Sequence, residues 1–156
     1  MKDHFRNLNL MFTALSIGQL LFLVIVLYVV VGEMELGSPL QIDQQTLLIA
    51  CAVGFLGVAY AARGLGNFFR NKAVKEKQAL EQKVTTYRSS LIMRWALVEG
   101  FNLFILIMAF LQEDKSLLLV FAAGLVVFFS LKPSVTAFAE AYELNLQEEN
   151  QLFSEG

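Results

Sequence analysis

The chain of 156 residues has few of the side chains from which enzyme active sites are usually built. It contains one histidine, His4, near the start, and one cysteine, Cys51, inside an apolar stretch. A single cysteine excludes an intramolecular disulfide framework. No pair of Asp or His residues lies within an apolar stretch, and no metal-ligand cluster or nucleotide-binding loop stands out. The sequence therefore predicts a protein that is not an enzyme and that holds no cofactor or metal.

Charged residues are also scarce along four apolar stretches, which cover residues 8–31, 47–65, 90–111 and 117–131. The chain as a whole is 56% hydrophobic, more than is usual for a soluble domain. About 20 apolar residues cross the hydrocarbon core of a bilayer as a helix. We therefore predict an all-α fold, with a four-helix transmembrane bundle over residues 1–131 and an acidic cytoplasmic tail over residues 132–156.

The first and fourth stretches each allow a second interpretation. Lys2 and Arg6 precede the first stretch as they would in a signal peptide, but its apolar run is too long and lacks a small-x-small cleavage pattern, so we expect a retained helix. The fourth stretch has about 15 residues, fewer than a span needs. It is either short, with flanking lysines that reach the interface, or it continues past Pro133.

Eleven of the 12 Lys and Arg residues lie on one side of these spans, and only Lys115 lies on the other. The connection over residues 32–46 carries acidic residues and no basic one, whereas the connection over residues 66–89 carries six basic residues. Basic residues near spans favour the cytoplasmic side. We therefore predict that both termini and the basic connection lie in the cytoplasm, in a multi-pass protein of the inner (plasma) membrane.

The basic connection has no Gly or Pro between Asn71 and Tyr87, and its apolar residues recur at spacings of three, four and seven. This pattern predicts one long third helix over about residues 71–111, whose cytoplasmic extension covers residues 71–89. Clustered Lys and Arg beside a span attract anionic lipids, although they also suit a solvated face that only sets the topology. The predicted headgroup contacts are Arg63, Arg70, Lys72, Lys75, Lys77 and Arg94. No feature favours nucleic acid as a partner.

The tail begins with Pro133 and Ser134, which predict a kink or a helix start. One face of a short amphipathic helix is then expected, formed by Phe138, Ala141, Tyr142 and Leu146. Five glutamates make this segment acidic. It is either a partly ordered tail or a segment that pairs with the basic connection on the same side of the membrane.

A few polar residues interrupt the spans. Glu99 lies nine residues into the third span, near mid-membrane, where a carboxylate must be protonated, paired or turned to a polar interior. Asn102 follows on the same helical face, and Gln19 lies at a similar depth in the first span, with Ser16 on the face of Gln19. We predict that these four residues form a buried polar cluster that joins the first and third spans by hydrogen bonds.

The second span is rich in small residues, several of them four apart, as Gly57 and Ala61 are. Small residues at this spacing let transmembrane helices approach closely. The predicted packing positions are Gly54, Gly57, Ala61 and, in the fourth span, Gly124. The pattern predicts tight packing, either within the bundle or in a homo-oligomer or larger membrane complex.

Two resemblances accompany these patterns. The run Ala96-Leu97-Val98-Glu99-Gly100, preceded by a Gly/Ala-rich helix across a polar loop, resembles the carboxylate-bearing hairpin of F-type ATP synthase subunit c. That resemblance covers about 60 residues and implies that Glu99 would carry a proton or sodium ion. The loop here is long and helical where that family has a tight turn, the dense alternating glycines are absent, and two extra spans flank the hairpin.

The whole chain also resembles small four-span bacterial membrane proteins of the Bacteroidota type, which carry no described function. The resemblance rests on the run from Arg94 to Gly100 and on Lys132-Pro133. Our leading hypothesis from the sequence is a structural or accessory subunit of a membrane assembly. The alternative is a proton- or ion-translocating oligomer that uses Glu99, and a membrane-embedded enzyme or transporter is the least favoured.

Overall fold

The computed structural model describes residues 2–31 and 42–154, and this part of the chain folds into six α-helices and no strand. The helices are α1 (Lys2–Val31), α2 (Gln44–Lys75), α3 (Leu80–Gln112), α4 (Leu117–Ser130), α5 (Val135–Ala141) and α6 (Leu146–Ser154). The prediction of an all-α fold is therefore confirmed. Most of the connection over residues 32–46, including Glu33 and Glu35, lies outside the described residues, as does Glu155 of the tail.

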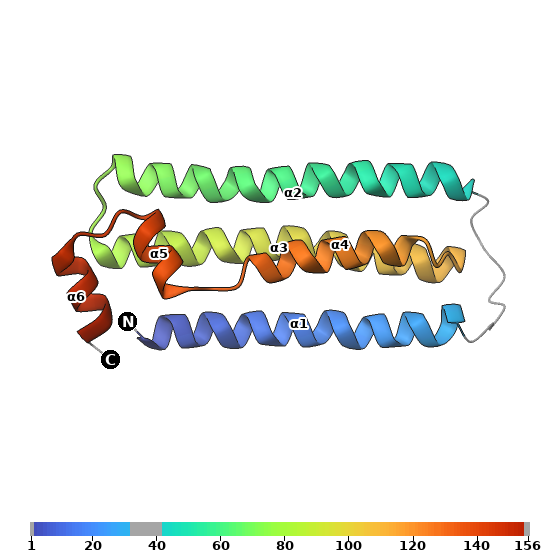
Figure 1. Ribbon diagram of the computed structural model, residues 1–156, viewed down its shortest axis with the longest axis horizontal. Helices are drawn as coiled ribbons and strands as arrows, with labels where there is room; N and C mark the ends of the chain where they lie inside the picture. The colour runs from blue at the N-terminus through green and yellow to red at the C-terminus, as the bar shows by residue number, and fades with distance from the viewer. Residues whose placement is uncertain (1, 32–41, 155–156) are drawn as a thin grey trace.

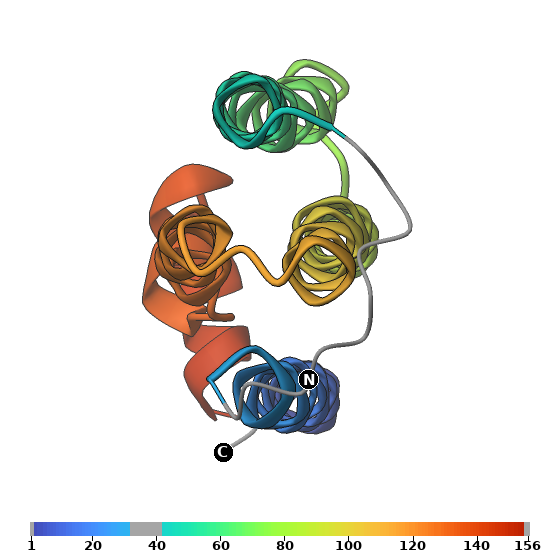
Figure 2. The same ribbon diagram turned by 90° about the vertical axis from the view of Figure 1, so that its right-hand side faces the viewer.

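The four longer helices run side by side, and the two short ones lie across one end of them (Figure 1). That end also holds the start of α1 and the turn between α2 and α3, and we call it the basic end because residues 66–89 carry six Lys and Arg. The end-on view places α1 and α2 on opposite sides of the bundle, with α3 and α4 between them (Figure 2). Helix α3 packs against α1, α2 and α4, so it is the central element.

Helices α1, α2 and α3 are each long and apolar enough to cross a membrane. The fourth predicted span is the exception, because α4 has 14 residues and α5 follows it at a bend of 75°. Fourteen residues rise about 21 Å, less than the roughly 30 Å of a hydrocarbon core. The described residues thus contain three candidate spans, or up to four if the bent pair α4 and α5 is counted as one span.

The prediction of one helix from about residue 71 to residue 111 is wrong at its beginning. Helix α2 continues to Lys75, and α3 begins only at Leu80. Between them the chain closes a Schellman motif, in which the Gln78 N–H donates to the Ala73 carbonyl and the Lys77 N–H to the Val74 carbonyl. Lys77 adopts a φ of 47°, in the left-handed region that usually selects Gly. No glycine marks this helix end in the sequence.

Charged residues end two further helices in the same way. Glu113 after α3 and Glu143 after α5 have φ values of 52° and 49°. In each case the following residue donates its N–H to a carbonyl five positions earlier, Asp114 to Ala109 and Leu144 to Ala139. The repeated motif turns the chain sharply at every one of these ends without glycine.

The break between α4 and α5 is held by two aromatic residues of α3. The Trp95 indole N–H donates to the carbonyl of Leu131, 3.1 Å away, which satisfies a carbonyl that the end of α4 leaves free. The Tyr87 hydroxyl lies 3.4–3.5 Å from the backbone N and O of Ser134. Ser134 is the N-cap of α5 and accepts from the Ala137 N–H, so the predicted helix start is confirmed.

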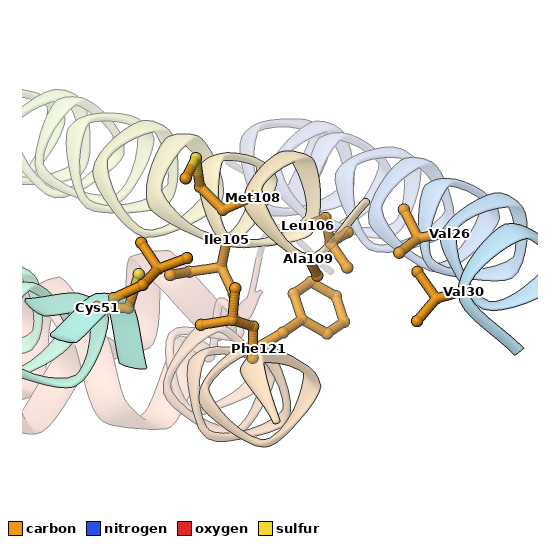
Figure 3. Close-up of a cluster of buried hydrophobic side chains, with 10 residues drawn as sticks. Val26, Val30, Cys51, Ile105, Leu106, Met108, Ala109 and Phe121 are labelled. Carbon is orange, nitrogen blue, oxygen red and sulfur yellow. The ribbon is translucent and has the colours of Figure 1, made fainter. Parts of the chain in front are cut away.

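The apolar core has three parts along the bundle. The part at the end opposite the basic end joins α1, α2, α3 and α4 around Ile105 and Phe121, and the lone cysteine, Cys51, packs there (Figure 3). The middle part surrounds Trp95, which packs against Phe12 of α1 at a ring distance of 5.6 Å, while Phe12 stacks on Phe128 of α4 at 5.0 Å. Cys51 is buried among apolar side chains, as expected for a cysteine that packs in the core.

The third part of the core lies at the basic end and explains why the tail is ordered. It brings together buried residues from five helices, namely Phe5, Ala73, Leu80, Val84, Phe138, Tyr142 and Leu152. Burial, with a smaller effect from Tyr87, raises the pKa of Tyr142 to about 12, so this phenol stays neutral. Over residues 135–154 the tail forms the two short helices α5 and α6, and this cluster packs them against the bundle. Leu146 does not share the buried face, because the chain turns at Glu143 and leaves Leu146 79% exposed.

Candidate functional site

The most enclosed polar group of the bundle is a pair of carboxamides from α1 and α3. Gln19 is fully buried and Asn102 is 1% exposed. The Asn102 Nδ2 donates to Gln19 Oε1 at 2.8 Å, so the predicted hydrogen bond between the first and third spans is present. Such interhelical bonds stabilise membrane proteins by about 0.6 kcal/mol on average. The Gln19 Nε2 has no hydrogen-bond partner among the described residues.

Helix α4 completes this carboxamide pair by presenting a glycine to it. A Cβ built on Gly124 would overlap Asn102 Oδ1 and lie 2.9 Å from Asn102 Cγ. Only a residue without a side chain therefore fits at this position while Asn102 keeps its conformation. The packing role that the sequence predicted for Gly124 has a specific cause, which is the space that the Asn102 carboxamide occupies.

Ser16 and Glu99, the two other members of the predicted cluster, are placed differently. The Ser16 hydroxyl is buried but donates to the Phe12 carbonyl of its own helix at 2.8 Å. Glu99 is half-buried and makes no hydrogen bond or ion pair with a described residue. Successive side chains on a helix are rotated by about 100° around its axis, so Glu99 lies beside the buried face that carries Val98 and Asn102. The structure brings together two residues of the predicted cluster and leaves Glu99 outside it.

The glycines of α2 face in two directions. A Cβ on Gly54 would lie 3.1 Å from the Phe101 ring of α3, and one on Gly66 would lie 3.0 Å from the Arg94 guanidinium. Side chains of α3 therefore occupy the space next to these two glycines. A Cβ on Gly57 or Gly64 would meet no atom within 4 Å, and Ala61 is exposed. The outward glycines have no packing partner in the described part of this chain.

The predicted headgroup residues also divide into groups. Arg63, Arg70, Lys72, Lys75 and Lys77 are exposed on α2 and the turn after it. Arg94 is half-buried, and its guanidinium lies across Gly66 of α2. Its Nε is buried without a hydrogen-bond partner among the described residues. The small-residue spacing of Ala62 and Gly66 signals a close approach, but not that an arginine fills it.

An ion pair that the sequence indicated only in outline fastens the tail to α3. Lys83 Nζ lies 2.9 and 3.0 Å from the two carboxylate oxygens of Glu148, and both side chains are largely buried. Burial raises the pKa of Glu148, but the hydrogen bonds from Lys83 and from the Asn145 N–H together lower it by more, so the net shift of this pKa is downward. The interpretation that the acidic tail pairs with the basic connection holds for this pair.

A second buried carboxylate, missed by the sequence reasoning, lies at the end opposite the basic end. Asp114 is 3% exposed, and its Oδ1 accepts from Gln44 Nε2 at 2.7 Å and from the N–H and hydroxyl of Ser116 at 2.8 and 2.6 Å. It joins the start of α2 to the turn between α3 and α4. The spacing of Asp114 and Ser116 is typical of an Asx turn and was the available signal.

The described residues contain no group of three or more His, Cys, Asp or Glu side chains that could hold a metal ion. Shallow hollows in the described surface lie at the basic end, and the one between α2 and α5 has walls of opposite charge. No family model matches the chain, and neither a curated protein nor a solved structure does. The arguments about function therefore depend on the geometry described above.

Proposed function

We propose that this chain is a non-enzymatic integral membrane protein that acts as a structural or accessory subunit of a membrane assembly. The carrying observation is the outward face of α2. Its small residues Ala50, Gly57 and Gly64 recur at intervals of seven, with Ala61 beside them, and all four are exposed. They form a shallow strip between larger exposed side chains such as Val53 and Tyr60.

The contrast within α2 supports this proposal. Its inward glycines, Gly54 and Gly66, are filled by side chains of α3, as close helix packing requires. Its outward glycines, Gly57 and Gly64, would allow the same close approach, but no side chain of the described residues packs against them. Because lipid tails gain little from a helix surface without side chains, the strip fits another transmembrane helix better than it fits lipid. The partner helix belongs to a second copy or to another subunit.

The test compares oligomeric mass in mild detergent for two matched glycine variants. We expect the wild type to purify with at least one further transmembrane chain, and Gly57→Leu to release it, because the leucine fills the strip. Gly100→Leu is the control, since Gly100 is also an outward glycine without a neighbour, but on α3. A wild type that is a single chain, or an equal effect of both variants, would contradict the proposal.

Glu99 favours a second candidate function, a proton- or ion-translocating oligomer. A carboxyl group in a membrane span that makes no hydrogen bond or ion pair is energetically expensive and is a functional-site hypothesis by default. Glu99 has no partner among the described residues, and its local sequence resembles the carboxylate helix of subunit c. In this candidate function, copies of the chain would enclose Glu99 and let it exchange a proton.

Glu99→Gln separates the two candidates because it preserves size and hydrogen bonding but cannot titrate. For a translocating oligomer we expect the variant to fold normally, to abolish pH-driven flux in reconstituted vesicles and to lose labelling by dicyclohexylcarbodiimide, which attacks protonated carboxyls in apolar surroundings. For an accessory subunit we expect no flux in either protein. Wild-type flux that persists in the variant would refute a titrating role for Glu99.

A further inference from the structure

A hollow of about 360 Å³ lies at the basic end between the last turns of α2 and the end of α5. Helix α5 is level with these turns along the bundle axis (Figure 1). One wall of the hollow carries two cations, Arg70 and Lys75 of α2, and the other wall carries two carboxylates, Glu140 and Glu143. The hollow therefore combines opposite charges on opposite sides, with a formal sum of zero.

The four charged groups do not neutralise one another. None of them forms an ion pair with a described residue, and the Arg70 guanidinium donates only to the side chain of its neighbour Asn71, at 3.2 and 3.3 Å. All four side chains are exposed. Each wall thus keeps its hydrogen-bonding capacity for a ligand, and the charge separation across the hollow selects a ligand that is itself a dipole of two charges.

The hollow lies where the polar layer of a membrane would meet α2. Phe68 is 61% exposed and is the last large apolar side chain on the outer surface of this helix, two residues before Arg70. Arg63 lies one to two turns earlier, and its long side chain can reach the interface. Arg70 lies about 10 Å beyond Arg63 along the helix, which is the depth expected for headgroups.

We propose that this hollow binds the headgroup of a zwitterionic phospholipid that carries a phosphate and a primary ammonium group. Arg70 and Lys75 bind the phosphate by charge-assisted hydrogen bonds, and Glu140 and Glu143 accept hydrogen bonds from the ammonium. The acyl chains extend along the apolar surface that begins at Phe68. The site thereby differs from a basic patch for anionic lipids, because an anionic headgroup brings no cation to the two glutamates.

Two features of the hollow define its selectivity. A primary ammonium donates three hydrogen bonds, whereas a quaternary ammonium donates none, so the carboxylates of Glu140 and Glu143 favour ethanolamine over choline. A headgroup with a phosphate and a neutral glycerol leaves both carboxylates without a counter-charge. Hydrogen bonds to charged groups stabilise by enough to give about a tenfold difference in affinity for each lost contact.

The test is a lipid titration of the detergent-purified full chain, followed by native mass spectrometry. The three probes are phosphatidylethanolamine, phosphatidylcholine and phosphatidylglycerol with identical acyl chains. We expect phosphatidylethanolamine to bind the wild type about tenfold more tightly than either other lipid. Equal affinity for the ethanolamine and choline lipids, or tighter binding of phosphatidylglycerol, would overturn the proposal without any variant.

Variants then test each wall of the hollow. Glu140→Gln with Glu143→Gln should bring the affinities for ethanolamine and choline lipids to within about twofold, and Arg70→Gln should weaken binding of both. Glu81→Gln is the matched control, because it removes an exposed carboxylate at the same end but outside the hollow. Equal loss of selectivity in the control would overturn the assignment. Soluble phosphoethanolamine that binds as tightly as the lipid would assign the hollow to a free solute and overturn the lipid proposal.

Discussion

Replacing Gly124 by alanine tests the contact of three helices around the Asn102 and Gln19 pair. The added Cβ would overlap Asn102 Oδ1, so the carboxamide must rotate and its 2.8 Å hydrogen bond to Gln19 must break. The lost interhelical bond costs about 0.6 kcal/mol and leaving the carboxamides without partners costs about 1–3 kcal/mol. The helix propensity of alanine returns about 1 kcal/mol. We expect a net destabilisation of about 1–2 kcal/mol.

Reversible unfolding in mixed detergent micelles measures this loss, and the fluorescence of the single tryptophan, Trp95, reports on the middle of the bundle. The cause is tested by a second background, Asn102→Ala, in which no carboxamide remains to be displaced. There we expect Gly124→Ala to stabilise the protein by about 1 kcal/mol through helix propensity alone, which gives a coupling energy of about 2–3 kcal/mol between the two positions. Gly100→Ala, at a glycine inside α3 with no neighbour, serves as the control and should stabilise the protein by about 1 kcal/mol, which is the gain in helix propensity alone. Equal costs of Gly124→Ala in both backgrounds would refute the reasoning.

Two further predictions concern the basic end. The pKa of Glu148 is lowered in the folded protein, so its ion pair with Lys83 stabilises the docked tail above the ordinary carboxyl pKa of 4.5 and loses this effect as the pH falls below it; thermal unfolding between pH 6 and pH 3 should show a steeper loss for the wild type than for Glu148→Gln, and identical profiles would exclude the pair as the cause. For orientation, we expect a membrane-impermeant thiol reagent, applied outside intact cells to a Cys51→Ser background, to label a cysteine at Gln45 and not one at Gln78, and the opposite pattern would reverse the proposed topology.

The long helices were predictable because their apolar stretches are continuous. The hydrogen bond between Gln19 and Asn102 was predictable because the two residues lie at similar depth in the first and third spans. The ends of α2, α3 and α5 were not predictable, because the left-handed positions that follow them are usually occupied by glycine and here hold Lys77, Glu113 and Glu143. Long-range contacts decide such cases, and here the apolar cluster around Phe138 holds the chain in place after each turn at the basic end.

The candidate site was predicted in half. Helical spacing correctly placed Asn102 toward α1, but it could not show that Glu99, three positions earlier, lies at the margin of the buried face. The direction of that margin depends on where α1 crosses α3, which no local pattern records. The contact of Arg94 with Gly66 was not predictable for the same reason, because it depends on how α2 and α3 pack against each other.

The short fourth helix has a consequence for the surrounding lipid. Helix α4 rises about 21 Å before the chain bends by 75°, while its outward side chains, such as Leu119 and Val126, are more than 70% exposed. Beside α4 the protein offers about 9 Å less apolar height than an average hydrocarbon core. In a bilayer, a span this short would be met by local thinning of the membrane or by flanking side chains that reach the interface, and it would favour shorter lipid chains next to α4 than beside α1 or α2.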